Sequence, residues 1–218
     1  MRLLIVTAVE AERDAATRHL EARGDLVGLT PVSTAGTAAG LVTVAAVGVG
    51  PAEAAAGTAL LLSAAPFDLV INAGIAGGFG LAPGAIAVAD RIVFADLGAE
   101  TADGFSPVSA LGFGRGEYPS VPLPVEATVG TILTVATVTG SAATAQRLRH
   151  AYPDAVAEAM EGAGVAAAAR AFGVPFAELR AISNAVGPRE RDRWQIPRGL
   201  DALARAVAAL TVTEWSQP

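Results

Sequence analysis

Two polar residues that follow apolar segments could recognise the two halves of a nucleoside. Glu161 stands in the segment 160–162 (MEG), at the head of an alanine-rich helix, and its carboxylate can accept two hydrogen bonds from a vicinal diol such as that of ribose. A helix cap is the alternative. Asn184 ends the segment 180–184 (RAISN) and presents a donor beside an acceptor, which matches a purine edge. An Asx turn that closes the strand is the alternative.

Two glycine-rich turns, at 48–50 (GVG) and 74–80, could bring a ligand against the backbone. Neither fits the dinucleotide-binding pattern or the P-loop pattern, and a tight strand-to-helix turn is the alternative for both. Because glycine lets ligand atoms approach the backbone closely, a flat base or sugar could lie against residues 74–78. Glu10 and Glu12 follow the first apolar run, where negative charge complements a helix macrodipole.

The composition argues against several other classes of protein. The chain has no cysteine, and His19 and His150 lie far apart in the sequence, so we expect no disulfide and no metal site. The formal net charge is −6, and no block of basic residues stands out that would track a phosphate backbone. We therefore expect no nucleic-acid partner.

The sequence also predicts no membrane segment. The first apolar run is too short for the core of a signal peptide. Residues 38–67 carry almost no charge, but Gly48, Gly50, Pro51 and Glu53 interrupt them, whereas a membrane helix needs about 20 continuous apolar residues. We expect a cytoplasmic protein with no membrane partner.

Continuous apolar segments alternate with helical ones along the whole chain, which favours a sheet covered on both faces. The fold class predicted is α/β, as a single domain over residues 1–218 with a central mixed β-sheet flanked by helices. Strands are expected at 3–8, 41–47, 67–73, 85–95, 131–139 and 176–183, with 155–160 as a further short strand. Helices are expected at 10–22, 52–63, 142–150, 163–172 and 200–215.

Residues 98–124 form the one extended segment without a regular pattern, and they hold several glycines and prolines. A loop of that length in a compact domain usually carries function, so it is a candidate for a substrate lid or a subunit contact. Ligands of open α/β sheets bind beyond the carboxyl ends of the strands. That rule indicates residues 8–13, 72–79, 139–144 and 183–193 as the surroundings of a site.

Five segments, in this order, resemble the nucleoside phosphorylase superfamily. The resemblance favours its nucleosidase branch, which comprises methylthioadenosine/S-adenosylhomocysteine nucleosidases and futalosine hydrolases. The segments are 7–12 (TAVEAE), 48–50 (GVG), 72–78 (NAGIAGG), 159–161 (AME) and 180–184 (RAISN). No one of them is decisive, but together they span nearly the whole chain. The resemblance implies an enzyme that cleaves the N-glycosidic bond of a small-molecule nucleoside without a metal or organic cofactor.

The resemblance also implies roles for individual residues. Glu12 would hold the attacking water as general base, and Glu161, beside Met160, would hold the ribose hydroxyls. Backbone groups of Ile75, Ala76 and Gly77 would line the base and sugar. Ser183 and Asn184 would lie at the N7 edge of the purine. Relatives form homo-oligomers whose subunits complete each other's 5′ sites, which makes 98–124 a candidate interface.

Two departures from the family pattern bear on specificity. Adenosine-type relatives have an aspartate where this chain has Asn184, whose amide can donate to N7 or O6 of a 6-oxopurine. A mismatch that leaves buried polar groups unpaired costs roughly 10⁴-fold in selectivity, so we expect a hypoxanthine nucleoside. Phosphorylases have an arginine and a hydroxyl residue where this chain has Asn72 and Ile75. Water is therefore the expected nucleophile.

The segment after Asn184 carries the features expected for the 5′ substituent of futalosine. Trp194 could stack on its benzoate ring, and Arg189, Arg191 or Arg193 could pair with the carboxylate. A solvated charged loop is the alternative. The aromatic residue that stacks on the base in adenosine-type relatives is missing from 139–143 (TGSAA).

The resemblance therefore favours a futalosine hydrolase, which releases hypoxanthine in menaquinone biosynthesis. Three alternatives stay open. Asn184 argues against a methylthioadenosine/S-adenosylhomocysteine nucleosidase, and Asn72 with Ile75 argues against a purine nucleoside phosphorylase. The presence of both Glu12 and Glu161 argues against a nucleoside-binding protein without catalysis.

Overall fold

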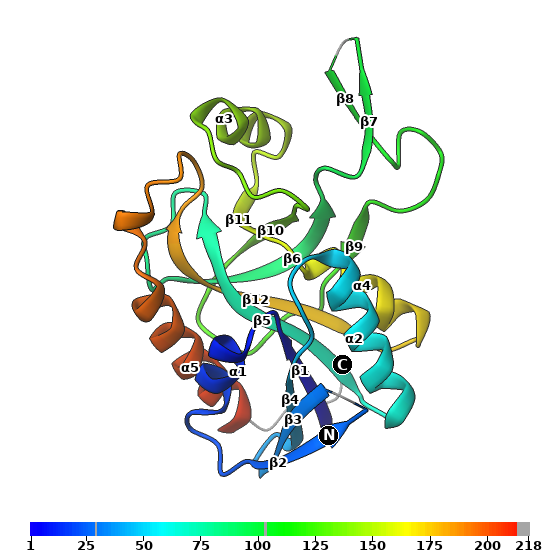
Figure 1. Cartoon of the computed structure of the whole chain (residues 1–218), viewed down its shortest axis with the longest axis vertical. Coiled ribbons are helices and arrows are strands. Elements are labelled where there is room, and N and C mark those ends of the chain that lie inside the picture. Colours follow the sequence, from blue (N-terminus) through cyan, green and yellow to red (C-terminus); the bar gives the residue numbers. More distant parts are fainter. Residues whose placement is uncertain (29, 103, 213–218) are drawn as a thin grey trace.

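A mixed β-sheet forms the centre of the molecule in this computed structural model, which describes residues 1–28, 30–102 and 104–212 (Figure 1). Its strands run in the order β11-β10-β6-β12-β5-β1-β4-β3-β2, and β9 pairs with β6. Their bounds are β1 Arg2–Thr7, β2 Arg23–Val27, β3 Thr30–Thr37, β4 Gly40–Ala46, β5 Leu69–Gly78, β6 Ile86–Phe94, β9 Glu117–Pro119, β10 Thr128–Thr134, β11 Ala155–Ala159 and β12 Phe176–Ala185.

Parallel pairing at the centre of the sheet explains the continuous apolar segments. β1 lies between β4 and β5, and β5 lies between β1 and β12, with parallel register in each pair. Strands of this kind are covered on both faces, so all their positions are apolar rather than every second one. The α/β class and the mixed sheet predicted from the sequence are confirmed.

The ends of two strands close part of the sheet on itself. Ala157 and Glu158 of β11 pair antiparallel with Gly78 and Gly77 of β5. The strands β5, β12, β6, β10 and β11 therefore form a closed ring. This closure brings the end of β11 beside the ends of β5 and β12, far apart though these segments are in the sequence.

Helices cover both faces of the sheet. α1 (Glu10–Thr17) packs against α5 (Ile196–Val212) on one face, and α2 (Pro51–Ala64) packs against α4 (Gly162–Ala171) on the other (Figure 1). α3 (Ala142–Ala151) lies beside the closed part of the sheet, and Arg191–Arg193 forms a short 3₁₀ turn. Pro51 opens α2 at a position where its missing N–H costs nothing. Within the described residues, no helix is both long and apolar enough to span a membrane.

Several predicted boundaries were wrong. The first helix ends at Thr17 rather than at residue 22, and the strand expected at 131–139 is Thr128–Thr134. The sequence did not predict β2 and β3, because β2 is largely exposed and has no apolar alternation. The last helix begins at Ile196 and is described to Val212, whereas its predicted end at Trp215 lies outside the described residues.

The segment 98–124 is more regular than expected. It contains a hairpin of β7 (Gly98–Thr101) and β8 (Gly104–Pro107), which projects from the molecule (Figure 1). Further along, β9 joins the main sheet against β6. These strands are three or four residues long, so they are stabilised by backbone pairing and carry too few side chains to show a period of two.

Candidate active site

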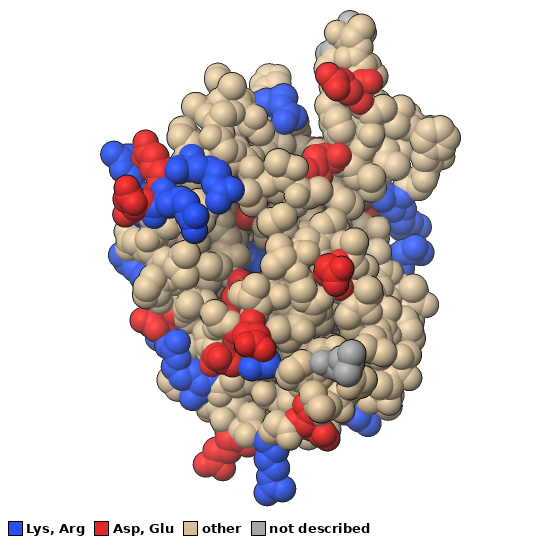
Figure 2. All heavy atoms as spheres, viewed as in Figure 1, with Lys and Arg blue, Asp and Glu red and all other residues tan. Residues whose placement is uncertain are grey.

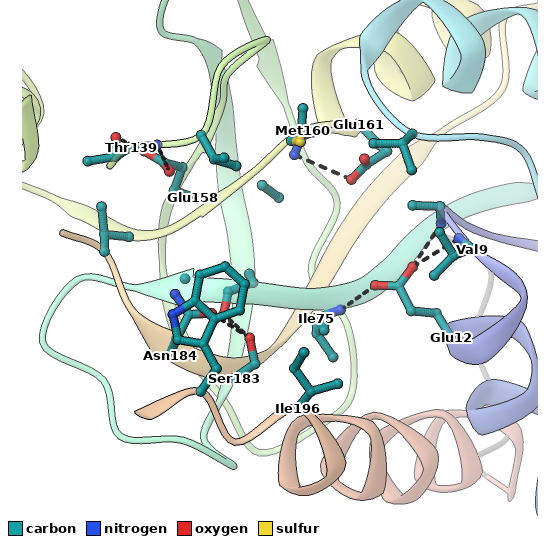
Figure 3. A pocket seen from close by; sticks show the side chains of 18 of the residues that line it. Val9, Glu12, Ile75, Thr139, Glu158, Met160, Glu161, Ser183, Asn184 and Ile196 are labelled. Carbon is teal, nitrogen blue, oxygen red and sulfur yellow. Dashed lines mark hydrogen bonds between the residues drawn. The ribbon is translucent and has the colours of Figure 1, made fainter. Parts of the chain in front are cut away.

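A pocket of about 580 Å³ opens where β1, β5, β11 and β12 end (Figure 3). Its volume is in the range of small-molecule sites. Apart from Arg193, the structure brings the predicted site residues to this one pocket: Glu12, Ile75, Ala76, Gly77, Met160, Glu161, Ser183, Asn184, Arg189, Arg191 and Trp194. Val9, Thr139, Glu158 and Ile196 also line it and were not singled out as site residues from the sequence.

Backbone amides hold the carboxylate of Glu12 at the start of α1. Its Oε2 accepts from the amides of Ala8 at 2.9 Å and Val9 at 3.3 Å, and its Oε1 accepts from the amide of Ile75 at 2.8 Å. Val9 is the N-cap of α1, and the bond from its amide to Glu12 is one of the two hydrogen bonds of a capping box. It also joins the ends of β1 and β5 and faces the pocket, with 4% of its surface exposed. Glu10 is exposed.

Burial raises the pKa of Glu12 above the ordinary glutamate value of 4.5. The guanidinium of Arg180 and the amides of Ile75 and Ala8 act in the opposite direction, while the nearby carboxylate of Glu161 raises the pKa further. A carboxylate with a raised pKa binds a proton more strongly, and it can act as a general base as long as it is ionised at the working pH.

Glu161 lies between the end of β11 and the start of α4, and its side chain extends toward the start of α2. Its Oε1 accepts from the amide of Gly50 at 3.1 Å, and its Oε2 accepts from that of Met160 at 3.3 Å. Glu161 occupies the N-cap position of α4, but its side chain makes no capping hydrogen bond within the described part of the helix. The helix-cap alternative is therefore wrong, and the carboxylate instead lines the pocket.

Arg180 is fully buried beneath both glutamates. Its Nε donates to Oε1 of Glu178 at 2.8 Å, and its Nη2 lies 3.3 Å from Oε2 of Glu161. Among the described residues, Nη1 and Nη2 have no hydrogen-bond partner. Burial alone would lower the pKa of Arg180, but the surrounding carboxylates raise it, so the side chain is charged. The sequence shows this residue only as a charge inside an apolar strand.

Gly74 makes the approach of Glu12 and Arg180 possible. A Cβ atom at this position would lie 2.6 Å from Nη1 of Arg180 and 2.6 Å from Oε1 of Glu12. The glycine predicted to admit a ligand therefore also admits two charged side chains.

A β-bulge turns Asn184 into the pocket. Ile182 pairs with Ala76 and Asn184 pairs with Gly77, which leaves Ser183 as the extra residue in β12. The Ser183 hydroxyl donates to Oδ1 of Asn184 at 2.7 Å, and Nδ2 of Asn184 donates to the Ala185 carbonyl at 3.0 Å. The oxygen is thus engaged by a hydroxyl rather than by the backbone N–H of an Asx turn. One amide hydrogen of Asn184 stays available to a ligand.

The arginines of the loop at 189–193 differ in their surroundings. The guanidinium carbons of Arg189 and Arg191 lie 5.4 and 5.8 Å from the centre of the Trp194 ring, within the range of cation–π contacts. All three side chains line the pocket. Arg193 instead forms a 2.7 Å ion pair with Glu190, and both are exposed, as a solvated loop predicts.

Asn72 is placed away from the pocket. It is fully buried in β5, and its side-chain atoms have no hydrogen-bond partner among the described residues. Ile75, by contrast, lines the pocket with its side chain while its amide binds Glu12. The sequence argument against a phosphate nucleophile therefore rests on Ile75.

Comparison with known proteins identifies the family of this chain. Residues 2–213 match the phosphorylase superfamily, and the chain belongs to that family. It is 53% identical to a futalosine hydrolase from Streptomyces coelicolor, over 96% of this chain and 95% of the relative. It is 46% identical to a futalosine hydrolase from Acidothermus cellulolyticus, over 96% and 90%.

A solved structure shows the same fold. It is that of the 5′-methylthioadenosine/S-adenosylhomocysteine nucleosidase from S. pneumoniae with a transition-state inhibitor, which superposes with a TM-score of 0.83. The two chains are 22% identical, and the match covers 97% of this chain and 98% of the other.

Proposed function

We propose that this chain hydrolyses the N-glycosidic bond of futalosine and releases hypoxanthine and dehypoxanthine futalosine, a reaction of menaquinone biosynthesis. The relatives that carry the name futalosine hydrolase support the substrate. The observation that carries the proposal is Asn184. Its oxygen is engaged by Ser183, so an N–H donor is offered to the pocket, as O6 or N7 of a 6-oxopurine requires.

The two glutamates and Arg180 provide for the attack of water on C1′ of the ribose. Glu12 accepts a proton from the water as the water oxygen bonds to C1′, and the guanidinium of Arg180, buried behind the pocket, balances part of the charge of Glu12 and Glu161. General base catalysis of this kind contributes about 10²–10⁴-fold. Glu161 accepts hydrogen bonds from the 2′ and 3′ hydroxyls, and its charge stabilises the cationic sugar of the transition state.

The C1′–N9 bond breaks as the water oxygen bonds to C1′, and its electron pair goes to the base. Asn184 stabilises the charge that develops on the purine by donating a hydrogen bond at the N7 and O6 edge. An amide cannot release a proton, so the base takes its proton from solvent. The proposed steps use residues of the chain and solvent protons, with no metal or organic cofactor.

Water rather than phosphate is the nucleophile in this proposal. The apolar side chain of Ile75 lines the pocket beside the carboxylates of Glu12 and Glu161. Two carboxylates repel a phosphate anion, and an isoleucine side chain cannot donate a hydrogen bond to it.

The 5′ substituent lies against Trp194 in this proposal, and Arg189 or Arg191 pairs with its carboxylate. Figure 2 shows basic and acidic side chains gathered over the turn at 190–193, on a chain of net charge −6. Because the molecule as a whole repels anions, local positive charge at the mouth of the pocket favours the approach of an anionic substrate.

We also propose that residues 1–218 act as one nucleosidase domain in the cytoplasm and that the chain forms a homo-oligomer. The apolar residues Leu97, Phe105 and Phe113 are exposed on and beside the projecting hairpin, which supports an interface there.

The proposal is tested by measuring purine-base release from futalosine, inosine and methylthioadenosine, each with and without phosphate. We expect hypoxanthine from futalosine at a rate that phosphate does not change, and release about 10²–10⁴-fold slower by a Glu12→Gln variant that still binds hypoxanthine. Adenine from methylthioadenosine as the preferred reaction would contradict the role of Asn184. Dependence on phosphate would contradict the role of Ile75, and no release from any nucleoside would favour a binding protein.

A further inference from the structure

Gly77 lies between two polar residues that approach it from opposite sides. Glu158 of β11 is its antiparallel register partner, and Asn184 of β12 is its parallel register partner. Directly opposed residues place their side chains on the same face of a sheet. Since neighbouring strands lie about 4.8 Å apart, the backbones of Glu158 and Asn184 stand roughly 10 Å apart with a bare glycine between them.

This arrangement occupies one end of the pocket. Figure 3 shows Glu158 and Asn184 toward one end and Glu12 and Glu161 toward the other, and all four line the same cavity. If the glutamate pair acts at the sugar, the opposite end receives the base. A purine edge with a hydrogen bond of about 2.9 Å at each side fits the spacing across Gly77.

Thr139 fixes the carboxylate of Glu158 in place. The amide of Thr139 donates to Oε1 at 2.9 Å, and its hydroxyl donates to Oε2 at 2.5 Å. A carboxylate can accept about four hydrogen bonds, so this pair leaves acceptor capacity on both oxygens. Both residues are buried and both line the pocket, which is the setting in which a mismatched ligand group costs most.

The two purine classes differ in the group that such an acceptor meets. A 6-oxopurine carries a hydrogen on N1, which is therefore a donor, whereas N1 of a 6-aminopurine is an acceptor without a hydrogen. An ionised carboxylate can only accept, so it attracts the first and repels the second.

Building on the proposed function, we propose that Glu158 is a specificity-determining residue that accepts a hydrogen bond from N1–H of the base. Asn184 donates a hydrogen bond to the N7 and O6 edge of the base from the other side of Gly77. Together the two residues recognise the donor N1–H and the acceptor O6 of a 6-oxopurine. In adenine the corresponding groups are reversed, since N1 is an acceptor and the 6-amino group is a donor.

A Glu158→Gln variant tests this proposal with two substrates, futalosine and its 6-amino analogue. Glutamine keeps an acceptor for Thr139 and adds an NH₂ group that can donate to N1 of the 6-amino base. We expect kcat/KM for futalosine to fall about 100-fold and that for the analogue to rise, so that the ratio of the two shifts by more than 100-fold. A Thr139→Val variant is the control, because it keeps the acceptor and should slow both substrates alike.

The rival role of Glu158 is to hold the loop around Thr139 and nothing more. In that case Glu158→Gln lowers kcat/KM for both substrates by the same factor, and the proposal is overturned. Failure of the proposed function is seen separately, because it would show as a wild-type enzyme that does not prefer futalosine over the 6-amino analogue.

A binding measurement on the wild-type protein adds a test that does not depend on how a variant folds. Calorimetry on the wild-type protein with hypoxanthine and 1-methylhypoxanthine compares two bases that share O6 and N7 but differ in N1–H. We expect at least 100-fold weaker binding of the methylated base, and a much smaller difference in Glu158→Ala, where the side chain no longer blocks the methyl group. Equal affinity of the two bases for the wild-type protein would refute the role of Glu158.

Discussion

Arg180 is the positively charged residue around which the carboxylates of the site are arranged. It is fully buried, pairs with Glu178 and Glu161, and interacts with Glu12 through space. Three carboxylates around one guanidinium leave an excess of negative charge, which suits a site that must stabilise a cationic sugar. The same excess disfavours ionisation of the carboxylates, and burial raises the pKa of both Glu12 and Glu178.

The raised pKa of Glu12 predicts how activity depends on pH. The carboxylate must be ionised to accept a proton, so kcat should fall as the pH is lowered through that pKa. Because burial raises the pKa above 4.5, the loss should begin at a higher pH than an exposed glutamate would give. The measurement is kcat against pH at constant ionic strength. In Glu12→Gln we expect about 10²–10⁴-fold lower kcat without this acid limb. The same limb in the variant would assign it to another group.

Glu178 positions Arg180, which predicts different effects for two substitutions. Glu178→Ala leaves Nε of Arg180 without its 2.8 Å partner and should lower the free energy of unfolding by about 3–5 kcal/mol. Glu178→Gln keeps an acceptor for Nε, so we expect it to recover most of the kcat that Glu178→Ala loses. Denaturant unfolding and steady-state kinetics on both variants check this. Equal kcat in the two variants would show that the position of Arg180 does not depend on this bond.

At the scale of elements, the bulge at Ser183 decides what β12 presents to the pocket. Arg180 and Ile182 share one face of the strand, and strict alternation would place residue 184 on that face too. The extra residue moves Asn184 to the opposite face, where it pairs with Gly77. A bulge depends on tertiary pairing and leaves no mark in residue types, so the sequence located Asn184 at a strand end but could not show how it faces the pocket.

The elements predicted well are those with many buried apolar residues. β1 and β5 have runs of fully buried side chains, and their order fixes where Glu12 and Gly77 lie. The elements missed, β2, β3 and β7–β9, are short, exposed or only partly buried, and they depend on backbone pairing with a neighbour. Glu158 was missed for a related reason. Its partners Thr139 and Gly77 lie on other elements, and only the closure of β11 onto β5 brings them together.

The close packing at β5 predicts a large effect for a small substitution. Gly74→Ala introduces a methyl group 2.6 Å from both Oε1 of Glu12 and Nη1 of Arg180, so one of these charged groups must move. Since misplacement of a catalytic group by about 1 Å can cost 10²-fold, we expect kcat to fall by about that factor. Gly36→Ala is the control, because a Cβ atom there meets nothing within 4 Å. Equal kinetics for the two variants would exclude a role for this packing.

At the scale of the whole molecule, the projecting hairpin bears on the proposed oligomer. The hairpin of β7 and β8 stands away from the rest of the fold (Figure 1). Phe113, close to it in the sequence, has 82% of its surface exposed, and Phe105 on β8 has 40%. Exposed apolar residues of this kind are what a subunit interface would cover, which is why the proposed oligomer is expected to use this segment. The exposed strands are also a ready edge for pairing with another chain.

Phe113→Asp should therefore separate the subunits. Light scattering on the wild-type protein should give a multiple of the 21.8 kDa chain mass, and the variant should approach the mass of one chain. Phe172→Asp is the matched control, since Phe172 is also exposed, at 45%, but lies at the end of α4. If subunits complete each other's 5′ sites, Phe113→Asp should raise KM for futalosine and leave KM for inosine unchanged, because inosine has no large 5′ substituent. A wild-type protein with the mass of one chain would refute the oligomer, and equal changes in both KM values would refute a shared 5′ site.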